Sequence, residues 1–115
     1  MSIDITACEY NPDIPVVKLV CRLDALTEPE LRPKVLEAVK GSERGIVLDL
    51  SGVDFVSSAG LRLLLVVHKS ASADGKEIGV VGVQPTVYKI FTLAKFEVMF
   101  KIYKDEAEAV KALWA

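Results

Sequence analysis

The run Gly45–Leu50 (GIVLDL) is the feature that most constrains the fold of this chain. Nearly every side chain in it is apolar, and apolar and polar residues do not alternate. A strand of this kind is usually buried on both faces, as in parallel sheets that are covered by helices on each side. The run therefore predicts an α/β domain, with this strand inside the sheet.

The elements expected around this strand give the order of the fold. Two strands come first, over residues 3–9 and 15–21, and the turn cluster Tyr10–Asp13 between them predicts an antiparallel hairpin. Helices and strands then alternate to the end of the chain. The expected helices are 27–41, 58–72, 85–94 and 105–113, and the later strands are 77–83 and 98–103. This order predicts a mixed β-sheet of about five strands with about four α-helices packed on it.

The first expected helix has a clear start signal in its sequence. Thr27 is placed to cap the free N–H groups, Glu30 stands at the capping-box position, and Pro29 fits an early helical position. Pro33 removes a backbone hydrogen bond about one turn later and predicts a kink. Gly41 is expected to end the helix. In the third expected helix the buried side is predicted to hold Val87, Ile90, Phe91 and Leu93.

Length and charge exclude several classes of protein. The 115 residues fit one domain, residues 1–115, and a net charge of -2 lacks the basic footprint of a general nucleic-acid binder. The longest apolar run, Leu63–Val67, is far shorter than the ~20 residues of a membrane span, and the N-terminus does not resemble a signal peptide. Cys8 and Cys21 are expected to be free thiols in a reducing compartment. We therefore expect a cytoplasmic protein without nucleic-acid or membrane partners.

Two serines stand where the chain passes from strand to helix, and they admit two interpretations. Ser57 or Ser58 can cap the helix by accepting hydrogen bonds from backbone N–H groups ahead of it. The same helix end also favours an added anion, because it carries free donors and the positive end of the helix dipole. Phosphorylation would add about -1.5 to -2 charges there without requiring a new fold. The spacing leaves both interpretations open.

The helix that follows the serines has an unusual surface. At about 100° per residue, one stripe is expected to hold Ser58, Arg62, Lys69 and Ala73, with Leu65 and Val66 beside it. The remaining apolar residues (Leu61, Leu63, Leu64 and Val67) can face the sheet. Large aliphatic residues on a solvent face suggest a docking surface, unless a neighbouring element of the chain covers them.

Residues 47–51 and 53–61 together resemble the signature of bacterial STAS-domain anti-sigma factor antagonists. That signature is a strand and an aromatic residue, followed by Asp-Ser-Ser/Thr-Gly-Leu at the opening of a helix. Leu23–Thr27 is similar to the Leu-Asp-x-x-Thr that follows the second strand of the family. The resemblance extends over nearly the whole chain and implies a STAS-like fold.

The resemblance also implies a phosphoacceptor, the serine two residues before the glycine, which is Ser58 here. Three positions depart from the family pattern: Ser57 replaces the usual Asp, Ala59 replaces the usual Ser or Thr, and Cys21 replaces a common Gly. The first change removes a carboxylate beside the acceptor. The second leaves Ser58 as the better-matched acceptor.

The partners implied by the family form a switch. The unphosphorylated protein would bind an anti-sigma factor that is also a serine kinase, and so free the sigma factor. Phosphorylation by that kinase, with its own Mg-ATP, would end binding, and a PP2C-type phosphatase would restore it. Asp24 admits a role in partner contact or in positioning Ser58, or that of an ordinary turn residue. The expected partner-binding residues are Asp24, Ser57, Ala59, Gly60, Arg62, Leu65, Val66 and Lys69.

Two other functions compete with this one. A STAS module can also serve as a scaffold or accessory subunit of another partner-switching or transport system. Catalysis is disfavoured, because the single histidine, His68, lies about 15 Å along the helix axis from Ser58, too far to act as its base. Val56–Gly60 is not a G-x-S-x-G elbow, and no phosphate-binding glycine loop or metal-ligand cluster stands out. We expect a binding protein with no cofactor of its own.

Overall fold

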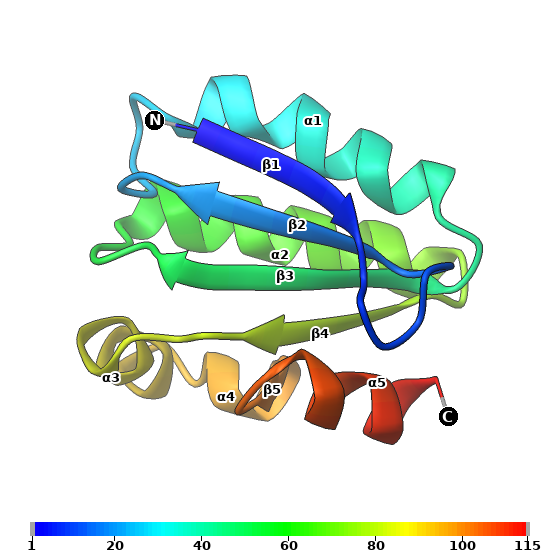
Figure 1. Ribbon diagram of the computed structural model, residues 1–115. Coiled ribbons are helices and arrows are strands. Elements are labelled where there is room, and N and C mark those ends of the chain that lie inside the picture. The colour runs from blue at the N-terminus through cyan, green and yellow to red at the C-terminus, as the bar shows by residue number, and fades with distance from the viewer. Residues whose placement is uncertain (1, 115) are drawn as a thin grey trace.

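A single sheet organises the chain. The computed structural model describes residues 2–114, so Met1 and Ala115, the ends of the domain expected over residues 1–115, lie outside the description. The elements, shown in Figure 1, are β1 (Ser2–Ala7), β2 (Pro15–Val20), α1 (Glu28–Gly41), β3 (Gly45–Gly52), α2 (Ser58–Ala73), β4 (Glu77–Val81), α3 (Pro85–Leu93), α4 (Phe96–Met99), β5 (Lys101–Tyr103) and α5 (Glu106–Leu113).

The sheet is mixed, as the sequence predicts. Its five strands lie in the order β1-β2-β3-β4-β5, with β1 antiparallel to β2 and every later pair parallel. The predicted N-terminal hairpin is therefore confirmed. β3 pairs on both sides, and its apolar residues are buried on both faces of the sheet. The apolar run Gly45–Leu50 thus forms the middle strand of the fold.

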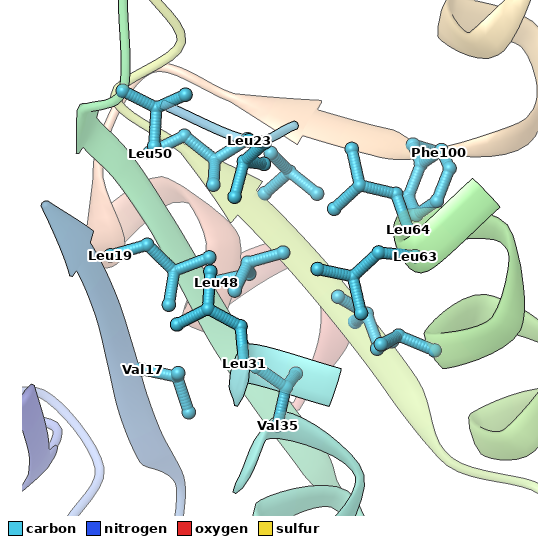
Figure 2. Packing of buried hydrophobic residues seen from close by; sticks show 14 of the residues in the cluster. Val17, Leu19, Leu23, Leu31, Val35, Leu48, Leu50, Leu63, Leu64 and Phe100 are labelled. Carbon is cyan, nitrogen blue, oxygen red and sulfur yellow. The ribbon is translucent and has the colours of Figure 1, made fainter. Parts of the chain in front are cut away.

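Helices cover the two faces of the sheet unequally. α1 and α2 pack side by side on one face and enclose the larger core, where Val17, Leu19 and Leu48 of the sheet meet Leu31 of α1 and Leu63 of α2 (Figure 2). α5 lies on the other face, against β4. The smaller core on that side contains Cys8, Ile14, Val16, Val47, Val81, Ala109 and Trp114.

The last strand is shorter than predicted, and a fifth helix takes its place. Residues 98–103 were expected as a strand, but α4 occupies Phe96–Met99 and β5 begins only at Lys101. Phe96 and Phe100 are four residues apart, and their ring centroids lie 5.4 Å from each other. Both rings also pack near Phe91 of α3. An extended chain would hold these two rings too far apart to stack, so this aromatic cluster favours a helical turn.

Leu93 corrects another expectation. Val87 and Phe91 of α3 are buried as predicted and Ile90 is half-buried, but Leu93 is 79% exposed. Two residues advance a helix by about 200°, so Leu93 points away from the side on which Phe91 is buried.

α1 begins where predicted, with Thr27 at its N-cap, but the predicted side-chain hydrogen bond is absent. Instead the Asp24 carboxylate accepts hydrogen bonds from the N–H groups of Leu26 and Thr27, at 3.0 and 3.1 Å. The Glu28 N–H already donates to the Asp24 carbonyl, so one helical turn precedes α1, and Asp24 is its cap. The helix continues past Pro33 to Gly41, where it was expected to end.

Three further features bear on the class of protein. Among residues 2–114, no helix is both long enough and apolar enough to cross a membrane. Cys8 and Cys21 are free thiols, as expected, with Cys8 buried and Cys21 half-buried. Asp105 caps α5 by accepting a hydrogen bond from the Glu108 N–H at 2.9 Å.

Gly79 allows α5 to pack closely on β4, which yields a stability prediction. A Cβ at this position would lie 3.1 Å from both the Ala109 Cβ and the Leu113 Cδ1. Gly79→Val should therefore push α5 off the sheet and lower the free energy of unfolding by about 1–3 kcal/mol, measured by urea denaturation. Ala112→Val adds similar bulk on the exposed side of α5 and should change stability much less. Equal losses in the two variants would contradict close packing at Gly79.

Candidate functional site

Two loops at the carboxyl ends of β2 and β3 are joined by backbone hydrogen bonds. The Leu23 N–H donates to the Phe55 carbonyl at 2.9 Å, and the Ser57 N–H donates to the Leu23 carbonyl at 2.8 Å. Leu23 and Val56 also form a parallel bridge and are both buried. The loop before α1 and the loop before α2 therefore form one unit, which fixes where α2 begins.

Ser57 is the residue that caps α2. Its side chain accepts a hydrogen bond from the Gly60 N–H at 3.4 Å, and its carbonyl accepts from the Leu61 N–H at 2.9 Å. Gly60 is buried in the first turn, where a Cβ would lie only 2.5 Å from the Leu23 carbonyl oxygen. The cap and the glycine together set the first turn of α2 against the Leu23 loop.

Ser58 lies outside this packed region. It is the first residue of α2 and is exposed, and no hydrogen bond involves its hydroxyl within the part of the chain that the structure describes. The first turn of α2 contains no acidic residue. The hydroxyl is accessible, and an anion attached to it would meet the positive end of the helix dipole without an adjacent carboxylate.

The predicted docking stripe lies on the solvent side of α2, and we call Ser58, Arg62, Leu65, Val66 and Lys69 the α2 face. Arg62 and Lys69 are exposed and Val66 is 39% exposed, whereas Leu63, Leu64 and Val67 are buried against the sheet. Leu65 is half-buried beside a hollow of about 560 Å³ that it lines with His68, Lys69, Ser72, Ala73 and Met99. The chain itself thus covers Leu65 in part and leaves Val66 open.

Ala59 and Gly60, which were expected to contribute to partner binding, are both buried. They present little surface to a second protein. Their packing beneath the first turn of α2 leaves Ser58 on the outer side of the helix.

Asp24 organises the neighbouring loop. Besides capping the turn before α1, its carboxylate lies 3.7 Å from the Arg22 guanidinium. No hydrogen bond or ion pair joins Asp24 to Ser58 among the residues that the structure describes. The turn role, one of the alternatives for Asp24, is therefore present, and its carboxylate shapes the loop that holds Leu23.

Sequence reasoning missed two exposed apolar residues on the joined loops. Leu26 is 89% exposed, and Phe55 is partly exposed with the Arg22 guanidinium 4.4 Å from its ring centroid. Both lie in the loops that precede α1 and α2. Large apolar residues within turn segments, where polar residues are usual, were the signal that could have identified them.

The site offers no catalytic constellation. His68 is half-buried on α2, and its ring centroid lies 5.2 Å from that of Phe100. Residues 2–114 contain no group of three His, Cys, Asp or Glu side chains that could hold a metal ion. Burial raises the pKa of the Cys21 thiol, which keeps it protonated and weakly nucleophilic near neutral pH. What the arrangement provides is a surface with an accessible hydroxyl.

Gly60 gives a sharp test of the packing beneath Ser58. Helix propensity alone would make Gly60→Ala more stable by about 1 kcal/mol. Because the new Cβ would collide with the Leu23 carbonyl, we expect instead a loss of about 1–3 kcal/mol in the free energy of unfolding, measured by urea denaturation.

Gly41→Ala is the matched control for this variant. Gly41 also lies in a helix, and a Cβ there would meet nothing within 4 Å. This substitution should leave stability unchanged or raise it slightly. A stabilised Gly60→Ala protein would show that the first turn of α2 does not depend on contact with Leu23.

Known proteins share the sequence family and the fold of this chain. Residues 6–109 match the model of the STAS domain. The anti-sigma F factor antagonist of Paenibacillus polymyxa is 28% identical over 106 residues, which cover 91% of each chain. An anti-sigma factor antagonist from Mycobacterium paratuberculosis superposes with a TM-score of 0.83 at 23% identity, covering 99% of this chain and 94% of that one.

A third neighbour has been solved in two chemical forms. SpoIIAA, the Bacillus cell fate determinant, superposes with TM-scores of 0.76 in its unphosphorylated form and 0.69 in its phosphorylated form, at 19% and 20% identity. Each comparison covers 96% of this chain, with 96% and 98% of the neighbour. The likeness extends over the whole sheet and its helices, and the family match spans nearly the full sequence. This chain therefore belongs to the STAS domain family.

Proposed function

We propose that this protein is an anti-sigma factor antagonist that binds an anti-sigma factor serine kinase and is released when Ser58 is phosphorylated. The observation that carries the proposal is an exposed hydroxyl on the first residue of α2, on the same face as exposed basic and apolar side chains. Relatives that share its length are anti-sigma factor antagonists, and one structural neighbour exists in a phosphorylated form.

In the unphosphorylated state the α2 face supplies both burial and orientation. Val66 and the open part of Leu65 would be removed from water by the partner, each contributing up to roughly 1.5–3 kcal/mol if fully buried. Arg62 and Lys69 would pair with acidic residues of the partner and fix the angle of approach. Leu26 and Phe55 add exposed apolar side chains in the loops that precede α1 and α2.

Phosphorylation would transfer the γ-phosphoryl group of ATP to the Ser58 hydroxyl oxygen. A bond forms between that oxygen and phosphorus, the bond to the β-phosphate breaks, the hydroxyl proton is released and ADP leaves. The nucleotide and its Mg²⁺ belong to the kinase. Ser57 is a poorer acceptor, because it is half-buried and its side chain caps α2.

The added charge would change the surface rather than the fold. The helix end accommodates an anion, since its first turn has no acidic residue and its dipole is positive there. Acidic partner residues that pair with Arg62 would then face a phosphate one helical turn away. A loss of only ~2.7 kcal/mol weakens binding a hundredfold. A PP2C-type phosphatase would reverse the change, with the whole cycle in the cytoplasm.

The phosphorylation step can be tested with the kinase that co-purifies with the protein from its native cells. Incubation with ATP should add one phosphate, which mass spectrometry places on Ser58. Ser58→Ala should abolish the modification, whereas Ser72→Ala, which removes another exposed serine of α2, should not. A phosphate found elsewhere would contradict the assignment. Recovery of membrane transport subunits in place of a kinase would favour a transport-accessory role instead.

Binding tests the switch itself. Ser58→Asp should keep the circular dichroism spectrum of the wild type and bind the kinase about a hundredfold more weakly by calorimetry. Ser72→Asp adds the same charge farther along α2 and should lose far less affinity. Equal affinity of the wild-type and Ser58→Asp proteins would remove the proposed mechanism.

A further inference from the structure

β1 is an open edge of the sheet, and the two edges differ in how they are protected. The opposite edge, β5, has only three residues, and its Lys101 pairs with Glu77 at 2.8 Å. β1 has six residues without lysine or proline, and its register with β2 runs without a bulge from Ser2 to Ala7. A short strand, a lysine, a proline or a bulge usually prevents one strand edge from pairing with another. β1 has none of these four features.

The free backbone groups of β1 are those of Ile3, Ile5 and Ala7. The Cys8 N–H donates to the Ile14 carbonyl at 2.9 Å and so points toward the β2 side of the hairpin. The direction of the backbone N–H and C=O groups alternates along an antiparallel strand, so those of Thr6 and Asp4 also point to β2. Those of the three odd-numbered residues point away from β2, to the open edge. Each of these three residues presents a free N–H donor and a free carbonyl acceptor at the same edge. Figure 1 shows β1, which forms this edge, beside α1.

An apolar groove lies directly over this edge. It has a volume of about 620 Å³ and lies between β1 and α1, with Ile3 and Ile5 on its floor and Lys34 and Glu37 of α1 among its lining residues. Ile5 is 52% exposed, a large fraction for an aliphatic strand residue. The groove and the open edge thus share the same side chains.

This surface complements itself under a two-fold rotation. The free groups are symmetric about Ile5, so an antiparallel pair centred there would match Ile5 with Ile5, and Ile3 with Ala7, of the second copy. The even-numbered residues would then pair as Asp4 with Thr6, which avoids an Asp4–Asp4 clash. Lys34 and Glu37 lie one helical turn apart, and the rotation reverses their order, so opposite charges can meet across the seam.

We propose that β1 pairs with β1 of a second copy of this chain to form a symmetric homodimer with one continuous sheet. In this dimer, β1 of the second copy fills the groove between β1 and α1. This interface uses neither Ser58 nor the rest of the α2 face, so it is independent of the proposed anti-sigma factor binding.

Analytical ultracentrifugation of the full chain over a concentration series tests the dimer. We expect a reversible monomer–dimer equilibrium in the wild type and, in Ile5→Lys, a dissociation constant raised about tenfold or more, because two lysines would meet at the two-fold axis. Thr6→Lys is the control: it lies one residue away on the other side of β1, opposite Asp4 of the second copy, so its dimer should be as tight or tighter. Circular dichroism verifies that both variants are folded.

A charge exchange tests the register and the groove together. Lys34→Glu alone should weaken the dimer, and the Lys34→Glu/Glu37→Lys double variant should restore most of its affinity. A wild-type protein that stays monomeric at millimolar concentration would overturn the proposal. So would an Ile5→Lys protein that dimerises normally, or a Thr6→Lys protein that loses the dimer to the same extent.

Discussion

One carbonyl group, that of Leu23, fixes the geometry on which the functional surface depends. It accepts the Ser57 N–H at 2.8 Å, and the backbone of Gly60 passes so close that any Cβ there would lie 2.5 Å from the oxygen. The first turn of α2 is therefore held at both of its ends. Because a helix turns about 100° per residue, holding Ser57 and Gly60 inward leaves Ser58 on the outer side.

The two adjacent serines divide tasks that one residue could not combine. A capping hydroxyl must point back along the helix to accept an N–H, as that of Ser57 does from Gly60. A modifiable hydroxyl must be free to enter the site of another enzyme, as the exposed Ser58 is. Since Ser57 already stabilises the helix start, a charge added at Ser58 need not remove the cap. The proposed switch can then act on partner affinity while the fold remains intact.

What the sequence predicts well follows from local periodicity. The run Gly45–Leu50, which is apolar on both faces of the strand, indicated a strand inside the sheet. The helical periodicity of α2 distinguished buried Leu63 and Leu64 from exposed Val66. These inferences succeed because each depends on residues only a few positions apart, where the geometry of a helix or strand is fixed.

The failures depend on contacts that no short window contains. α4 forms because Phe96 and Phe100 meet Phe91 of another helix, and a local pattern of apolar residues cannot distinguish that arrangement from a strand. Thr27 lies at the N-cap of α1 as predicted, but its side chain does not cap the helix, because its hydroxyl donates to the Arg22 carbonyl at 2.6 Å.

The sheet order keeps the two proposed interfaces apart. β1 lies at one edge, α1 packs over β2 and β3, and α2 packs beside α1 toward β4. α1 therefore stands between the groove at β1 and the α2 face, and a dimer formed through β1 would leave Ser58 open on both copies. A partner with two equivalent sites would then gain avidity from the second contact, and phosphorylation of both copies would remove two contacts at once. Pairing through β1 would thereby steepen the response of the switch without any change at Ser58 itself.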